Sequence, residues 1–402
     1  MIKIEEELKK GSEISIIKLI DGLIEYGYDS RASDIHIDPE ETGIRVRLRV
    51  DGILKNSFIF PKEIHSEIIT RIKILAGLRT DDHQTPQDGR FRLTIKKINL
   101  LDIRVSIIPT YYGENAIMRL LAEKTEKFTL ETLGFNERNR NKILDAIKKP
   151  YGMILCTGPT GSGKTTSLYT IIKLLNKPEV SIITIEDPIE YSVEGVDQIQ
   201  VNPHTGLTFA SGLRSILRQD PNIIMVGEIR DEETAGIAIN ASLTGHLLLS
   251  TIHTNDASTT LPRLLDMKVE SFLIASTVNI AIAQRLVRKI CSNCKVKKII
   301  TEDKKRSLSE VLSQKILHDY KEFYEGKGCS MCNNTGYYGR VSIHEILVVN
   351  DEIREAITRK ANASEIKEIA IKNGMETMVE DGFKKVIEGV TTIEEILRVI
   401  HE

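Results

Sequence analysis

The segment Gly158–Thr165, GPTGSGKT, restricts the possible folds of this 402-residue chain more than any other feature. It matches the phosphate-loop pattern G-x-x-x-x-G-K-[ST] at every fixed position. The apolar run Met153–Cys156 comes just before it, and residues 165–175 after it have helical spacing. Glycines let backbone N–H groups surround a phosphate, and the start of a helix adds a favourable dipole. Strand, loop and helix in this order predict a nucleotide-phosphate site, the alternative being a glycine-rich turn that binds nothing.

Each part of this loop has an expected role in binding ATP. Lys164 is expected to contact the β- and γ-phosphate oxygens, and Thr165 to bind Mg²⁺. The expected nucleotide-binding residues are Gly158, Pro159, Thr160, Gly161, Ser162, Gly163, Lys164, Thr165 and Thr166.

Short apolar runs alternate with helical patterns from about residue 130 to residue 287. This alternation is typical of stacked βαβ units around a mostly parallel sheet, so the expected fold class is α/β. Ligands of such sheets bind at the carboxyl ends of the strands. Every run leads into a polar cluster, and these clusters should therefore converge. The four runs are Met153–Cys156, Ile182–Ile185, Ile223–Val226 and Leu247–Leu249.

Two acidic clusters follow such runs. Residues 186–190 (EDPIE) follow the second run, and residues 228–231 (EIRD) follow the third. A single cluster of this kind is usually a solvated surface. Two clusters downstream of a phosphate loop favour a hydrolytic site, because hydrolysis needs one carboxylate near the metal and another that orients water.

Histidines flank the fourth run, with His246 at its start and His253 after its end. A histidine here either hydrogen-bonds to the γ-phosphate or plays a structural part, and the spacing does not separate these alternatives.

The chain has further zones before and after this core. Residues 33–121 mostly follow a period of two, with a helical pattern at 63–78, which predicts a small α+β domain. Residues 1–31 are expected to form one helix. Paired cysteines open the last zone, and helical patterns run from residue 351 to the end. The expected divisions are residues 1–125, 126–287, 288–345 and 346–402.

Four of the five cysteines form two C-x-x-C pairs, Cys291/Cys294 and Cys329/Cys332. Paired thiolates at this internal spacing suit tetrahedral Zn²⁺, so we expect a structural zinc lobe. A redox C-x-x-C would not need a second copy. Cys156, on the strand before the phosphate loop, is expected in the core.

Charge and hydropathy narrow the expected location and partners. Lys and Arg (55) nearly balance Asp and Glu (57), whereas nucleic-acid-binding proteins are typically basic. The uncharged stretch Ser271–Gln284 is shorter than the roughly 18 residues of a membrane span. We expect a cytoplasmic protein with peripheral membrane contact only. A local basic run is more typical of a solvated face than of a lipid, nucleic-acid or protein contact; it comprises Arg285, Arg288, Lys289, Lys295, Lys297 and Lys298.

The motifs together resemble a known family. Residues 158–165, 183–190, 225–231 and 245–253 are similar to the Walker A, Asp box, Walker B and His box of secretion ATPases of the GspE/PilB type, which serve type II secretion and type IV pilus assembly. Residues 32–39, 86–90 and 102–106 resemble the domain that precedes the motor in that family, and residues 374–382 and 388–392 resemble its C-terminal end.

This resemblance implies a fold and roles for individual residues. The fold would be a RecA-like P-loop domain preceded by a small PAS-like domain, with an inserted zinc lobe and a helical C-terminal end. Glu190 would activate water, Glu228 would hold Mg²⁺ with Thr165, and His253 would contact the γ-phosphate side. Arg90 and Arg104 would reach the nucleotide from the N-terminal domain. The assembly branch of the family carries a tetracysteine lobe, in agreement with the zinc prediction.

The resemblance also implies a setting. The chain would form a homo-hexamer that hydrolyses Mg-ATP and drives pilin or pseudopilin movement through an inner-membrane platform protein, at the cytoplasmic face of that membrane, with no stable nucleic-acid partner. About thirty residues precede the motif at 32–39, so we expect a short form without the extra N-terminal docking domain, such as those serving competence systems. Two alternatives stay open, namely a zinc-containing nucleic-acid translocase and a scaffold that binds ATP without hydrolysing it.

Overall fold

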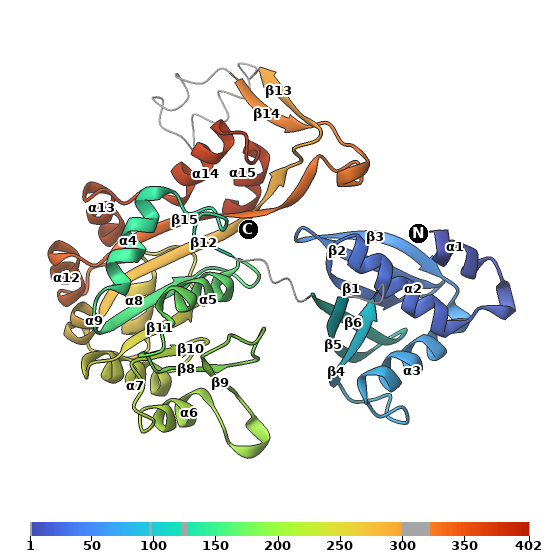
Figure 1. Cartoon of the computed structure of the whole chain (residues 1–402), viewed down its shortest axis with the longest axis horizontal. Helices are drawn as coiled ribbons and strands as arrows, with labels where there is room; N and C mark the ends of the chain where they lie inside the picture. The colour runs from blue at the N-terminus through green and yellow to red at the C-terminus, as the bar shows by residue number, and fades with distance from the viewer. Residues whose placement is uncertain (1, 96–98, 123–127, 300–321, 402) are drawn as a thin grey trace. The chain divides into compact units, whose positions relative to one another are not determined.

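The computed structural model describes residues 2–95, 99–122, 128–299 and 322–401 (Figure 1). The chain forms two compact units, residues 1–126 and 127–402. Both combine helices and strands, and no helix in the described ranges is long and apolar enough to cross a membrane.

The first unit is a six-stranded antiparallel sheet whose order is β3-β2-β1-β6-β5-β4. Helices α2 and α3 contact strands of this sheet through one apolar core. The expected α+β pattern is present, and its PAS-like character stays a prediction. The strands are β1 Ala32–Pro39, β2 Ile44–Val50, β3 Ile53–Phe60, β4 Gln87–Ile95, β5 Asn99–Thr110 and β6 Gly113–Ala122, and the helices are α1 Ile2–Leu8, α2 Ile16–Asp29 and α3 His65–Ala76.

The single helix expected at residues 1–31 is wrong, because two α-helices occupy this segment. Helix α1 ends at Leu8, a 3₁₀ turn covers Gly11–Glu13, and α2 starts at Ile16. Gly11 has a φ of +59°, which interrupts a helix and which glycine adopts without strain. The helical periodicity of the two halves hid this break.

The second unit is built on a seven-stranded sheet of order β15-β12-β7-β11-β10-β8-β9. All neighbouring strands are parallel except the pair β12 and β15. The predicted α/β class with a mostly parallel sheet is therefore confirmed. The strands are β7 Gly152–Thr157, β8 Ile182–Glu186, β9 Asp197–Gln200, β10 Ile223–Val226, β11 Leu247–Ile252, β12 Val278–Ile290 and β15 Tyr337–Val348.

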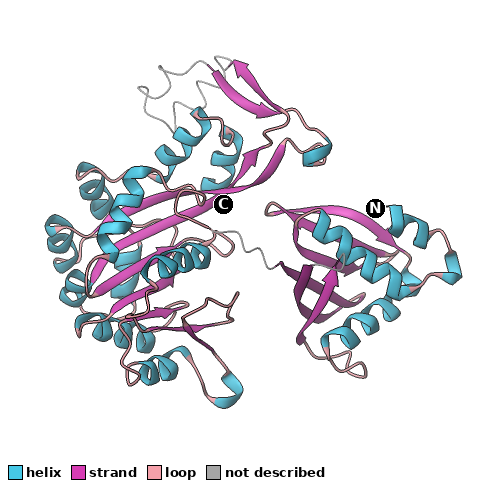
Figure 2. Cartoon of the chain, viewed as in Figure 1, coloured by secondary structure: helices cyan, strands magenta, loops and turns pink. Residues whose placement is uncertain are grey.

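Helices cover both faces of this sheet (Figure 2). In β7, Met153 and Leu155 face one apolar core, while Ile154 and Cys156 face the other. Helices α4 Glu137–Ile147 and α5 Lys164–Leu175 belong to the core of Cys156. The opposite core contains α6 Phe209–Ile216, α7 Glu232–Leu243, α8 Thr260–Asp266, α9 Ser271–Thr277, α12 Asp351–Thr358, α13 Ala363–Lys372, α14 Met378–Ile387 and α15 Ile393–His401.

The cysteine segment projects from two strands of this sheet. The expected limits of the lobe, 287/288 and 345/346, fall inside β12 and β15. A small antiparallel ribbon, β13 Lys295–Ile299 with β14 Glu322–Gly326, lies between the cysteine pairs. The positions of the cysteines therefore depend on the edge of the central sheet.

Candidate functional site

The loop Gly158–Thr165 joins β7 to α5 through three glycines with positive φ. These are Gly158 (+142°), Gly161 (+79°) and Gly163 (+90°), in regions that L side chains rarely adopt. A Cβ atom on Gly158 would lie 2.5 Å from the Gln284 carbonyl oxygen. The backbone conformation and this close approach both require glycine.

Two side chains in this loop are suited to a phosphate. The Lys164 ammonium donates to the carbonyl oxygens of Gly158 (2.8 Å) and Pro159 (3.0 Å), and its burial lowers its pKa. The buried Ser162 hydroxyl has no hydrogen-bond partner in the part of the chain that the structure describes. A buried, unpaired hydroxyl is costly unless a ligand satisfies it. An ammonium and a free donor at the start of a helix fit an anion.

A buried glutamine on β12, which the sequence analysis missed, holds the loop in place. Gln284 Nε2 donates to the Ser162 carbonyl oxygen (2.7 Å), and its Oε1 accepts from the Ser167 hydroxyl (2.8 Å) on α5. The signal was a glutamine directly after the apolar run Ile280–Ala283 of β12. Its partners lie more than 100 residues away, so spacing could not reveal them.

The predicted acid and histidine come together at the ends of two neighbouring strands. His253 Nε2 lies 3.1 Å from Glu228 Oε2, and Arg230 Nε lies 2.5 Å from the same oxygen. The strands are joined beside them, because the hydroxyls of Ser250 and Thr251 donate to the carbonyl oxygens of Val226 and Gly227.

His246 and His253, whose roles the sequence left undecided, lie at opposite ends of β11. The His246 ring nitrogen Nδ1 donates to the Ala241 carbonyl oxygen (2.9 Å), at the start of the strand. This contact fits the structural alternative for His246. His253 alone is on the side where the polar clusters converge.

The two glutamates of the first acidic cluster have different surroundings. Glu186 ends β8, is buried, and accepts hydrogen bonds from the hydroxyls of Tyr169 and Thr184. Glu190 is half-buried in the loop that leads to β9. Glu186 is therefore held by hydroxyl donors within the core, whereas Glu190 lies in a loop at the carboxyl end of β8.

The two predicted arginines of the first unit are direct neighbours. Arg90 on β4 is opposite Arg104 on β5, and Arg104 is opposite Arg119 on β6. Directly opposed residues of antiparallel strands point to the same face. Arg119, which sequence analysis did not single out, also contacts Asp34 (Nε to Oδ1, 3.0 Å). Three cations therefore form a row across this sheet.

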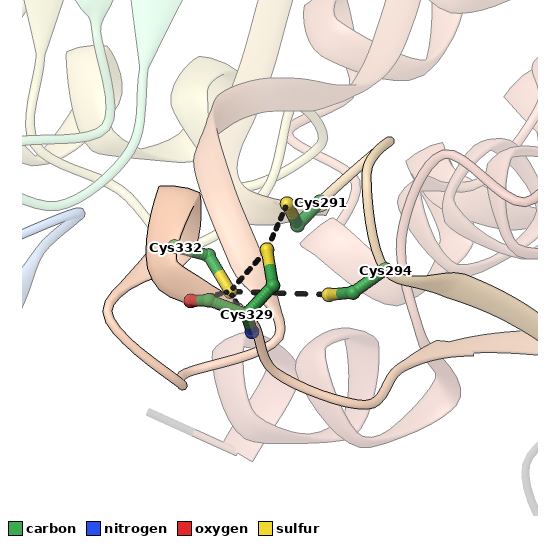
Figure 3. A group of neighbouring side chains, drawn as sticks. All are labelled: Cys291, Cys294, Cys329 and Cys332. Carbon is green, nitrogen blue, oxygen red and sulfur yellow. Dashed lines mark hydrogen bonds between the residues drawn. The ribbon is translucent and has the colours of Figure 1, made fainter.

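The four paired cysteines gather at one point (Figure 3). Their sulfur atoms lie within 4.8 Å of one another, and Cys291–Cys329, Cys294–Cys332 and Cys329–Cys332 are separated by 3.8, 3.8 and 3.7 Å. A regular tetrahedron with Zn–S bonds of about 2.3 Å has edges of about 3.8 Å. The cluster therefore has the dimensions of a tetrahedral zinc site.

Backbone donors surround these sulfurs. The amides of Cys329 and Gly336 donate to Cys332 Sγ (3.2 and 3.3 Å), and the amide of Gly328 donates to Cys294 Sγ (3.3 Å). A hydrogen bond from Asn293 lowers the pKa of Cys329 to about 6, whereas desolvation raises the pKa of Cys294 to about 12. N–H donors favour thiolates, the form that binds metal.

Most of the basic run is paired within the chain. Arg288 binds Glu395, Lys297 binds Glu322, and Lys298 binds Glu325. Lys295 lies over the Tyr324 ring. Internal pairing of these cations was not part of the expectation of a solvated face, and it occupies four of the six side chains.

The phosphate loop on a mostly parallel sheet, with Glu228 and His253 just after the ends of the adjacent strands β10 and β11, defines a P-loop ATPase. The chain belongs to the type II/IV secretion system protein family, whose model matches residues 9–398. It is 47% identical to the type II secretion system protein E of Xanthomonas campestris over 97% of this chain and 68% of that protein. It is 46% identical to the type IV pilus assembly ATPase PilB of Thermus thermophilus over 98% of this chain, which spans 44% of that protein.

Solved structures share the fold. The pilus retraction motor PilT, crystallised with bound ADP, covers 94% of this chain at 26% identity and a TM-score of 0.63. The ATPase DotB of Legionella pneumophila covers 95% at 22% identity and a TM-score of 0.68, a likeness of fold alone. The resemblance drawn from the sequence is confirmed.

Proposed function

We propose that this chain hydrolyses Mg-ATP to drive the assembly of pilin or pseudopilin subunits in a type II secretion, type IV pilus or competence system. The carrying observation is the strand order. Strand β7 leads into the phosphate loop and pairs with β11, and β11 pairs with β10, so the phosphate loop, His253 and Glu228 all follow the carboxyl ends of neighbouring parallel strands. The names of the relatives, a secretion protein E and a pilus assembly ATPase, support this system.

The chemistry assigns one task to each side chain. Glu190 accepts a proton from the water that attacks the γ-phosphorus, while the bond from that phosphorus to the bridging oxygen breaks and leaves ADP and phosphate. Lys164 and His253 stabilise the charge on the phosphate oxygens. Thr165 and Glu228 would hold Mg²⁺, which supplies further neutralisation of the phosphates when bound. The remaining proposed nucleotide contacts are Gly158–Gly163 and Thr166.

The first unit would act as a nucleotide sensor. Arg90 and Arg104, adjacent in the sheet, would approach the triphosphate when it is present and withdraw after phosphate leaves. Loss of this attraction would let the two units move apart and convert hydrolysis into movement. We propose a homo-hexameric ring as the setting, bound peripherally to a platform protein at the cytoplasmic face of the inner membrane.

The cysteine cluster would hold one structural Zn²⁺ through Cys291, Cys294, Cys329 and Cys332. Its sulfur separations match a tetrahedral tetrathiolate site. The metal would tie the end of β12 to the start of β15 across the ribbon between them.

Glu190→Gln tests the proposed function directly. We expect kcat for ATP hydrolysis to fall roughly 10²- to 10⁴-fold, because the base is lost, while ATP still binds in an equilibrium titration. Full hydrolysis by this variant would contradict the role of Glu190, and full assembly in cells without hydrolysis would favour the scaffold alternative. The translocase alternative predicts salt-dependent stimulation of hydrolysis by added DNA or RNA. We expect none.

A further inference from the structure

A buried tyrosine connects the helix that follows the phosphate loop to the loop that carries Glu190. Tyr169 lies on α5, whose first residue is Lys164, and it is completely buried. Its hydroxyl donates to Glu186, the last residue of β8, and its ring packs against the ring of Tyr191, the residue after Glu190. One side chain thus joins α5, the end of β8 and the loop of the proposed base.

Glu186 holds the Tyr169 hydroxyl in place. Besides Tyr169, it accepts hydrogen bonds from the Thr184 hydroxyl (2.6 Å) and from Gln198 Nε2 (3.1 Å). Burial, with the hydrogen bond to Glu186, raises the pKa of Tyr169. The phenol therefore stays protonated and remains a donor throughout the neutral range.

Gln198 on β9 fastens the same loop beyond Glu190. Its Nε2 donates to the Tyr191 carbonyl oxygen (3.2 Å) and its Oε1 accepts from the Val193 amide (2.8 Å). Gln198 Nε2 also lies 3.2 Å from the Tyr169 hydroxyl oxygen. The Tyr191 ring packs edge-on against Tyr169, with 4.6 Å between ring centroids. The loop is held at Tyr191 and Val193, just after Glu190.

We infer that Tyr169 and Gln198 are positioning residues that fix Glu190 relative to the phosphate loop. This inference rests on the proposed role of Glu190 as the base. Tyr169 and Lys164 belong to the same helix. A displacement of the phosphate loop would therefore also move Tyr169, which contacts the loop that carries Glu190. A base must stay within hydrogen-bond reach of its water, and a misplacement of about 1 Å lowers the rate about 10²-fold.

Tyr169→Phe is the decisive variant, because it keeps the ring and its contact with Tyr191 but removes the hydroxyl. We expect kcat to fall roughly 10- to 100-fold. The KM for ATP should change little, because the phosphate loop keeps its own contacts with the nucleotide. Thr170→Val is the matched control. It removes a buried hydroxyl from the next position of the same helix, one that donates only to the Thr166 carbonyl oxygen, and it should leave kcat unchanged.

A double-mutant cycle separates positioning from a general loss of structure. In a Glu190→Gln background, Tyr169→Phe should cost almost nothing further, because the group it positions is gone. An equal loss in both backgrounds would overturn the inference. Gln198→Leu provides a second test and should also lower kcat more than it raises KM.

The outcomes also separate this inference from the proposed function. If Glu190→Gln abolishes hydrolysis while Tyr169→Phe and Gln198→Leu hydrolyse ATP like the unchanged chain, only the positioning role fails. If Glu190→Gln itself retains full hydrolysis, the proposed role of Glu190 fails, and the positioning role fails with it.

Discussion

His253 Nε2 lies 3.1 Å from Glu228 Oε2, across two parallel strands that neighbour each other in the central sheet. The Glu228 carboxylate is largely buried and also contacts Arg230. One carboxylate oxygen thus contacts both the imidazole of His253 and the guanidinium of Arg230. The pair lies at the carboxyl ends of the strands, where a parallel sheet binds its ligands.

Glu228→Gln should abolish most hydrolysis without preventing nucleotide binding. The amide keeps the shape but removes the charge that would hold Mg²⁺, so we expect kcat to fall roughly 10²-fold or more and the Mg²⁺ requirement to rise. Steady-state hydrolysis over a magnesium titration measures both. Glu232→Gln is the control, because this exposed carboxylate on the same segment pairs with Lys268 instead. Equal losses in both variants would contradict the assignment.

Gln284→Leu should weaken ATP binding through the phosphate loop. The substitution leaves the Ser162 carbonyl and the Ser167 hydroxyl without their buried partner. One lost hydrogen bond at this site corresponds to about 1.4 kcal/mol, or about a tenfold rise in Kd. Calorimetric titration with ATP measures the change. Thr277→Val, which removes another buried hydroxyl close by in the sequence, should bind ATP normally.

Purified protein should contain about one zinc per chain, and Cys332→Ser should lose it. Cys332 Sγ accepts two backbone N–H bonds, so it is central to the cluster. Cys156→Ala is the control and should keep the metal. Burial raises the pKa of Cys156 to about 12, and we therefore expect a thiol reagent at pH 8 to modify four cysteines after chelation and to spare this one. Full zinc content in Cys332→Ser would refute the site.

Glu395 should make stability depend on acid pH. Burial alone would raise the pKa of this carboxyl, but hydrogen bonds from Arg288 and Arg398 outweigh burial and lower the pKa to about 2. A depressed pKa stabilises the fold above the unfolded value of about 4.3. That contribution is lost as the pH falls towards about 2.

Glu395→Gln should therefore lower the free energy of unfolding near pH 7 by about 3 kcal/mol. The difference from the unchanged chain should shrink between pH about 4 and pH about 2. Denaturant titrations at several pH values measure it. A difference independent of pH would show that packing, and not charge, explains the effect.

Rings that contain both Arg90→Ala and unchanged subunits should hydrolyse ATP more slowly than the share of unchanged subunits predicts, if the subunits of the proposed hexamer hydrolyse ATP in a coordinated way. Arg92→Ala is the control, because Arg92 is two residues away on the same face of β4 but pairs with Asp102 (3.2 Å). Hydrolysis rates over a series of mixing ratios decide the question. A strictly proportional loss would mean that the subunits act independently.

Local sequence determined much of this protein. The glycine spacing of residues 158–163, the apolar runs of the parallel strands and the two C-x-x-C pairs each specify local backbone or ligand geometry. Period-two and helical patterns depend on neighbours a few residues apart, so they can be recognised without a fold. The break at Gly11 shows the limit, because two short helices have the same periodicity as one long helix.

Only the tertiary structure decided which distant side chains meet. Gln284 reaches Ser162 because β12 lies beside β7, and Glu228 meets His253 because β10 lies beside β11. Tyr169 reaches Glu186 because α5 packs close to the end of β8. Each of these contacts depends on strand order and helix packing, which are set by the burial of the whole core and not by any local pattern.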